Sequence, residues 1–190
     1  MIRGICRLTV ALGLAVAVTS GAFAGPVADR AAEAEAKLSA GDPAAALTAF
    51  DAATEAFWNA SPLQFRVATF ADSVAGFARY APRADSTFHT GDSVTIYLEP
   101  VGYGFVSDRD SSRVSFQSGV EIRQGDIVLG KTDDLGKLDW EGREKNYAVH
   151  AAISLTLPDL KPGDYTMLLT LTDDASEKAA TTTLPFTIAE

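Results

Sequence analysis

From Leu63 to the end of the chain, apolar and polar residues alternate in short runs that are separated by turn-forming residues. Successive side chains on a strand point to opposite faces of a sheet, so a period of two predicts strands with one buried face. No helical run interrupts the pattern, which favours antiparallel pairing. Pairs of aspartates at 133–134 and 173–174 are typical of turns. The expected strands are residues 63–71, 93–99, 112–124, 126–130, 147–157, 165–171 and 180–188.

This set of strands predicts that residues 63–190 form an antiparallel β-sandwich of the immunoglobulin or fibronectin type III kind. The segment Leu160-Lys-Pro-Gly-Asp-Tyr165 resembles the tyrosine corner of such sandwiches. There, Pro and Gly shape the turn and a buried tyrosine hydroxyl donates to a backbone carbonyl a few residues upstream. This part of the sequence therefore has a structural task and indicates the fold rather than the function.

Residues 25–62 differ from the rest of the chain, because they are rich in alanine and glutamate and nearly free of β-branched residues. They predict a hairpin of two helices that break at Gly41, since glycine favours the left-handed conformation that ends a helix. Asp42 is a natural N-cap, and Pro43 suits the first helical position. The second helix should carry one apolar stripe of residues three and four apart, namely Ala46, Leu47, Phe50, Ala53 and Phe57.

The hairpin resembles a single tetratricopeptide repeat. It matches the pattern Gly-Asp-x3-Ala-x3-Phe-x2-Ala of such repeats at five positions: Gly41, Asp42, Ala46, Phe50 and Ala53. The resemblance covers one repeat, and a single repeat cannot bury its apolar face alone. We therefore expect the hairpin to pack on its own β domain, on a second copy or on a partner.

The first 24 residues have the three parts of a secretory signal peptide. Arg3 and Arg7 form a basic start, and the apolar run Leu8–Val18 follows. Small residues at positions 22 and 24 then mark a cleavage site. The run has 11 residues, whereas a transmembrane helix needs ~20. We therefore expect cleavage after Ala24, no membrane insertion afterwards, and a periplasmic or secreted protein.

Cleavage would also change the chemistry of the chain. The only cysteine, Cys6, lies in the signal peptide, so disulfides, thiolate metal sites and cysteine nucleophiles are excluded in the mature protein. Two of the 16 basic residues are lost, which leaves 14 against 25 acidic residues and moves the formal charge from −9 to −11. Such an acidic chain is expected to be soluble and to bind neither nucleic acid nor anionic membranes.

The sequence shows no constellation that is typical of an enzyme or a metal site. The two histidines, His89 and His150, are isolated, and no Gly-x-Ser-x-Gly is present. The segment SDRDSS at 107–112 begins like a calcium loop, but Gly119 stands where such a loop has its glutamate. We therefore expect a protein that is not an enzyme and that has no catalytic residues, no metal and no cofactor.

The best candidate for a binding site is the segment IYLEPVGYGF at residues 96–105. Its aromatic residues Tyr97, Tyr103 and Phe105, together with Trp140, could offer a platform to a sugar or a peptide. The alternative is that these rings fill the open end of the sandwich.

Three segments of the mature chain resemble a group of uncharacterised bacterial secreted or periplasmic proteins. They are Tyr-x-Pro-Arg-x-Asp at 80–85, YLEPVGYGF at 97–105 and the terminal segment at 162–188. The resemblance implies a tetratricopeptide-like hairpin followed by an immunoglobulin-like sandwich, and it brings no activity. We expect a non-enzymatic binding or scaffold protein that contacts another envelope protein. The alternative is a carbohydrate-binding module for envelope or extracellular polysaccharide.

Overall fold

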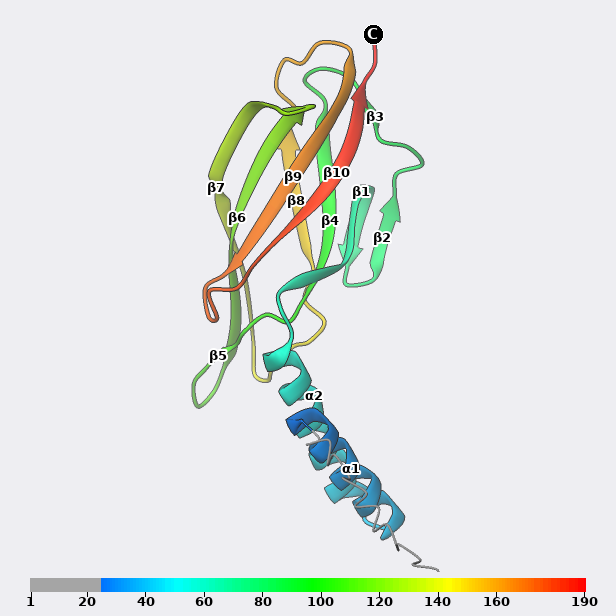
Figure 1. The fold of residues 1–190 in the computed structure, drawn as a ribbon, viewed down its shortest axis with the longest axis vertical. Coiled ribbons are helices and arrows are strands. Elements are labelled where there is room, and N and C mark those ends of the chain that lie inside the picture. Colours follow the sequence, from blue (N-terminus) through cyan, green and yellow to red (C-terminus); the bar gives the residue numbers. More distant parts are fainter. Residues whose placement is uncertain (1–24) are drawn as a thin grey trace, which may run out of the picture.

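The computed structural model describes residues 25–190, so the predicted signal peptide at 1–24 lies outside the described residues. Two helices come first and ten strands follow within this range. The helices project from one end of the β part, as Figure 1 shows. The prediction of a helical hairpin followed by a mainly β domain is therefore confirmed.

The hairpin consists of α1 (Pro26–Ser39) and α2 (Pro43–Ala60). Gly41 lies between them at φ 80°, a conformation that glycine adopts without strain. The Asp42 carboxylate accepts a hydrogen bond of 3.0 Å from the backbone N–H of Ala45, and Pro43 begins α2. The predicted break and caps of the hairpin are therefore confirmed.

The first sheet has four antiparallel strands, which lie in the order β2-β1-β4-β8. Their bounds are β1 (Gln64–Gly76), β2 (Arg79–Pro82), β4 (Ser93–Val101) and β8 (Ala151–Thr156). The pairing of β1 with β4 ends at Ala71, and irregularities in register follow in β1. The second half of β1 therefore pairs with β2 alone.

The second sheet is mixed, because β10 pairs with β3 in parallel and all its other pairs are antiparallel. Its order is β3-β10-β9-β6-β5, and β7 pairs with β6 as well. The bounds are β3 (Thr87–Phe88), β5 (Val106–Ser107), β6 (Ser112–Gln124), β7 (Ile127–Gly142), β9 (Gly163–Asp173) and β10 (Ala179–Ile188).

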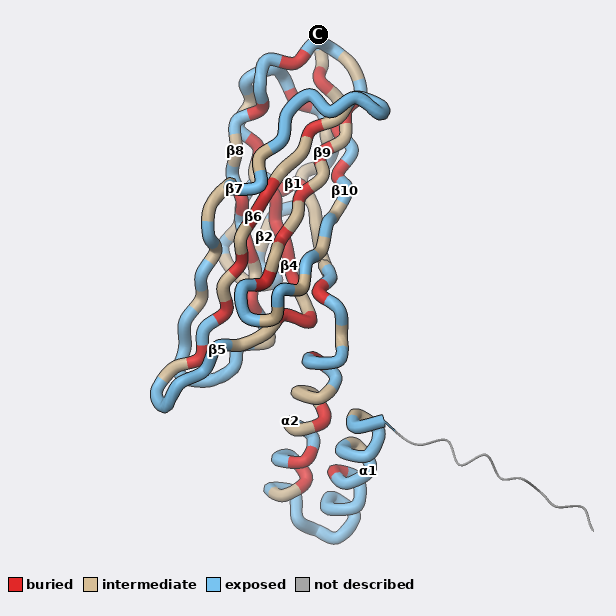
Figure 2. Tube along the Cα trace, turned by 60° about the vertical axis from the view of Figure 1, so that its left-hand side comes forward, coloured by how far each residue is buried: buried red, intermediate tan, exposed pale blue. Residues whose placement is uncertain are grey.

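The apolar core lies between the two sheets and takes residues from both. Met167, Leu169 and Leu171 of β9 are fully buried, and Figure 2 shows buried positions along the inner strands. The Tyr165 hydroxyl donates a hydrogen bond of 2.7 Å to the Lys161 carbonyl, which is the contact expected of a tyrosine corner. The predicted alternation of β9 and β10 is therefore confirmed.

Several predicted strand boundaries were wrong. The strand expected at 63–71 continues as β1 to Gly76, and the short strands β2, β3 and β5 were not predicted. The expected strand at 126–130 is the start of β7, which continues to Gly142, so Asp133 and Asp134 lie within a strand rather than in a turn. This strand borders only β6 and is mostly exposed, so it lacks the buried face that produces alternation. The strand expected to begin at Tyr147 begins at Ala151, because the residues before it turn towards the hairpin.

Candidate functional site

The segment at 96–105 contributes to two different places in the fold. Ile96 and Leu98 belong to the core between the sheets, so the alternation of β4 turns Tyr97 and Glu99 to the other face of the first sheet. Tyr103 and Phe105 follow the end of β4, where Tyr103 packs on Trp58 of the hairpin and Phe105 packs on Tyr103. The predicted aromatic residues therefore do not form one surface.

Tyr97 is fully buried although it faces away from the core. The ring of Tyr80 from β2 stacks on it with centroids 3.9 Å apart. The Tyr97 hydroxyl donates to the Glu99 carboxylate at 2.7 Å and accepts from the Ala78 N–H at 2.8 Å. The turn after β1 and the strand β2 thus cover Tyr97, and its ring face is closed to a ligand.

These contacts make stability depend on pH at the alkaline end. Burial, followed by the hydrogen bond to Glu99, raises the pKa of Tyr97 from 10.0 to about 12. A pKa raised in the folded state gives stability that is present below pH ~10 and is lost as the pH rises towards 12. We expect the free energy of unfolding, measured with denaturant from pH 8 to 12, to fall less steeply in Tyr97→Phe than in the wild type. Equal slopes would contradict this assignment.

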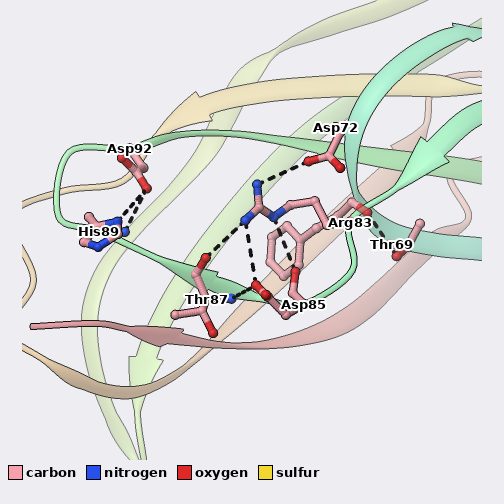
Figure 3. Close-up of polar contacts among 8 residues, drawn as sticks. Thr69, Asp72, Arg83, Asp85, Thr87, His89 and Asp92 are labelled. Atoms are coloured by element: carbon pink, nitrogen blue, oxygen red, sulfur yellow. Dashed lines mark hydrogen bonds and ion pairs between the residues drawn. The ribbon is translucent and has the colours of Figure 1, made fainter.

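Arg83, from the Tyr-x-Pro-Arg-x-Asp segment, connects this edge of the first sheet to β3 of the second sheet (Figure 3). Its guanidinium donates to the Asp72 carboxylate at 3.3 Å and to the Thr87 carbonyl at 3.2 Å. It also lies 4.6 Å from the centre of the Phe88 ring, which is buried. Arg83 therefore joins β1, β3 and the segment between β2 and β3, and its donors are used within the fold.

Tyr103 and Phe105 belong to an aromatic cluster at the junction of the hairpin and the β domain. Trp58, near the end of α2, meets the rings of Tyr103 and Tyr147 edge to face at 5.0 and 4.8 Å. Phe105 meets the same two rings at 5.4 and 5.1 Å. Trp58 and Tyr103 are buried, and the Tyr103 hydroxyl donates to the Asn146 carbonyl at 2.6 Å. The sequence allowed two interpretations of Tyr103, a platform for a ligand or a ring that fills the end of the sandwich. The packing of its ring agrees with the second.

Trp140 lies on β7 and is half-buried. Its ring contacts Phe116 at 6.0 Å, and Phe116 contacts Tyr103 at 5.7 Å. Trp140 is therefore connected to the aromatic cluster through Phe116 of the core. Tyr97 belongs neither to this cluster nor to the surroundings of Trp140.

Polar contacts of Lys178 and Asp173 beside the aromatic cluster stabilise the same junction. The ammonium of Lys178 donates to the carbonyls of Asn59, Ser61 and Gly102 at 3.2, 2.7 and 3.0 Å. It thus joins the end of α2 to the segment after β4. Gly102 has φ 81°, and a Cβ there would lie 2.2 Å from the Pro62 carbonyl oxygen, so only glycine allows this approach.

Asp173, at the end of β9, makes the second set of these polar contacts and is fully buried. Its carboxyl oxygens accept from the backbone N–H of Gly104 at 2.6 Å, from that of Ala175 at 3.2 Å and from the Ser176 hydroxyl. Asp173 therefore fixes both the β9–β10 turn and the irregular segment between β4 and β5.

Away from its junction with the β domain, the hairpin exposes four large apolar side chains. Leu38, Leu47, Phe50 and Phe57 expose 62, 62, 58 and 54% of their surface. The helices meet instead through small residues, because the buried positions, apart from Trp58 at the junction, are Ala34, Ala46, Ala49 and Ala53. The stripe predicted for α2 is therefore split, since its alanines face α1 and its large residues do not. We call the set of exposed residues Leu38, Leu47, Phe50 and Phe57 the apolar face.

Among the hollows that border α2, two differ clearly in chemical character. The first is a groove of about 350 Å³ within the hairpin, lined by Ala31, Ala34, Glu35, Leu38, Pro43, Ala46, Leu47 and Phe50. The second is a cleft of about 660 Å³ between α2 and the loops of the β domain, with charged groups of both signs. The ion pair of Glu55 with Lys145 joins α2 to one of these loops. Of the two, the groove is the apolar one. The sequence did not predict this groove, because it does not show which part of the apolar stripe of α2 is covered by α1.

The comparisons with known proteins give no family. No protein-family model matches the chain, and no curated protein matches it. Among solved structures, the crystal structure of Spo0M, a sporulation control protein from Bacillus subtilis, covers 68% of this chain at 8% identity and a TM-score of 0.35. The chain spans about half the length of that protein.

The described residues also bear on membranes and metals. No helix within 25–190 is long and apolar enough to cross a bilayer. Within the same range, no group of three or more His, Cys, Asp or Glu side chains is placed to hold a metal ion. His89 is exposed and pairs with Asp92 at 3.6 Å, and His150 is half-buried beside Tyr97.

Proposed function

We propose that this protein is a non-enzymatic binding or scaffold protein that docks another protein on the apolar face of its helical hairpin. The observation that carries the proposal is the exposure of Leu38, Leu47, Phe50 and Phe57 on one side of a helix pair. Single exposed apolar residues are ordinary, but a contiguous set beside a groove marks an interaction surface.

The attachment of the hairpin supports this role. Trp58 and Lys178 connect the end of α2 to the β domain, and Glu55 adds an ion pair with Lys145. Because the hairpin is held in place, a partner that docks on it meets a preformed surface and loses less entropy on binding. The β domain then acts as the base that presents the hairpin.

The tyrosine corner at Tyr165 and the core between two sheets favour an immunoglobulin-like sandwich, with β3 added in parallel at one edge. The basic start, the apolar run and the small residues of positions 1–24 favour export to the periplasm or the outside of the cell. The partner would then be another envelope or extracellular protein.

The carbohydrate-binding alternative has less support. Sugar platforms need open aromatic faces, and Tyr97 and Tyr103 are fully buried. Phe105 and Trp140 are half-buried and pack against other rings. We therefore assign the binding role to the hairpin rather than to the segment at 96–105.

Affinity capture with matched variants tests the proposed function. The tagged wild type should enrich at least one protein that Leu47→Ser/Phe50→Ser loses by about tenfold or more, a loss of about 1.4 kcal/mol or more. The control Ile127→Ser/Val128→Ser changes apolar residues that are similarly exposed at the distant β6–β7 turn and should keep the partner. Equal enrichment by the wild type and the hairpin variant, quantified by mass spectrometry, would refute the proposal.

A further inference from the structure

From the charges around the apolar face, we infer that its occupant is an amphipathic helix of a partner protein with basic residues along its flanks. This inference rests on the proposed function and adds the chemistry of the partner. The groove of about 350 Å³ provides the apolar part of the site.

The shape of the face suits a helix. Leu47, Phe50 and Phe57 are three and seven residues apart on α2, so they form one row along its axis. Leu38 at the end of α1 and the alanines Ala31 and Ala34 form the opposite wall of the groove. The row from Leu47 to Phe57 spans about 15 Å at 1.5 Å per residue, which is the length of about three turns. The groove is lined by Leu47 and Phe50, and Phe57 continues the row beyond it. A helix laid along this row would use apolar anchors at i, i+3 or i+4, and i+7.

Carboxylates border this face on both sides. Glu35 lines the groove from α1. Asp51 lies one residue after Phe50 and four after Leu47, so it occupies the flank of the row that is turned away from α1. There it also lines the cleft between α2 and the β domain, together with Arg143 and Lys145. Both residues are exposed. A helix in the groove would therefore have a negative charge on each flank.

The basic residues of the hairpin are on the other side. Arg30 and Lys37 line a separate hollow with Glu33, Thr48 and Ala52, and Arg30 pairs with Glu33 at 3.2 Å. The hairpin has six acidic residues against these two basic ones. Lysine and arginine on the partner would meet opposite charges at both flanks.

The same charges argue against two other occupants. In a pair of identical hairpins, Glu35 and Asp51 would face an acidic partner, which is unfavourable. An anionic lipid surface attracts basic segments, and this face is bordered by carboxylates. A helix with apolar and basic residues matches both the exposed apolar side chains and the carboxylates that border them.

Peptides of about 14 residues, long enough for four turns, provide the probes. One has leucine at i, i+3, i+4, i+7 and i+11 with lysine elsewhere, the second has glutamate in place of lysine, and the third is the lysine peptide with its order scrambled. Binding to the protein purified from cells that express the full chain is followed by fluorescence anisotropy. The lysine peptide should bind about tenfold more tightly than the glutamate peptide at low salt, and this ratio should shrink at high salt.

Three double variants make the test specific. Leu47→Ser/Phe50→Ser should abolish the binding of the lysine peptide, and Ile127→Ser/Val128→Ser should not change it. Glu35→Lys/Asp51→Lys keeps the apolar face and should reverse the preference towards the glutamate peptide. Circular dichroism shows whether each variant is folded before binding is compared.

Several outcomes would overturn the inference. They are equal binding of the lysine and scrambled peptides, a preference that the double lysine variant leaves unchanged, and a dimer that Leu47→Ser/Phe50→Ser dissociates. The inference would also be overturned if the protein sedimented with vesicles of phosphatidylcholine and phosphatidylglycerol and Leu47→Ser/Phe50→Ser did not. If affinity capture yields a partner through the hairpin but its contact segment is acidic or uncharged, this inference fails and the proposed function stands.

Discussion

Replacing Trp58 by alanine will destabilise the protein by about 3 to 5 kcal/mol, the range measured for large aromatic residues removed from a packed site. Trp58 is buried and contacts Tyr103 and Tyr147 edge to face, so its loss leaves a cavity where the hairpin meets the β domain. The hairpin should also become more mobile, which hydrogen–deuterium exchange of residues 43–60 will report. Denaturant unfolding followed by circular dichroism gives the change in stability.

The neighbouring residue provides the control for this variant. Phe57 belongs to the same turn of α2 but is more than half exposed. Phe57→Ala should therefore change the free energy of unfolding by less than about 1 kcal/mol. Equal losses in the two variants, or unchanged exchange in Trp58→Ala, would show that Trp58 does not anchor the hairpin.

Replacing Asp173 by alanine should cost about 2 to 4 kcal/mol, because it leaves buried donors without partners. The carboxyl group accepts hydrogen bonds from the N–H groups of Gly104 and Ala175 and from Ser176. We expect the loss to appear both in the midpoint of denaturant unfolding and in faster amide exchange of Gly104.

Asp174 is the matched control, since it follows directly and its carboxylate is partly exposed. It pairs with Lys137 at 2.9 Å and accepts from Ser115, and these partners lower the pKa of its carboxyl group. Exposed pairs contribute at most about 1 kcal/mol, so Asp174→Ala should be mild. A loss for Asp174→Ala as large as that for Asp173→Ala would contradict the role given to Asp173.

Local chemistry explains what could be predicted. Gly41, Asp42 and Pro43 define a helix break within three residues, and no distant contact is needed to interpret them. Strands β9 and β10 alternate cleanly because one face of each is buried. The strand β7 was predicted too short because an exposed strand beside a single neighbour has no such face.

The candidate site depended on contacts that local patterns do not contain. Tyr97 is covered by Tyr80 and Ala78, which come from a different strand and turn. The stripe of α2 was identified correctly as apolar, but the alanines of the hairpin decide which part of it α1 buries. Sequence periodicity gives the direction of a side chain and not the presence of its neighbour.

Photo-crosslinking in living cells tests the central claim, that the apolar face docks a partner protein. A benzoylphenylalanine at position 47 lies on this face, and the same residue at position 127 lies at the exposed start of β7. We predict a discrete adduct at position 47 only, which maps by mass spectrometry to a basic, amphipathic segment of another protein. The same background of abundant proteins at both positions would contradict the account.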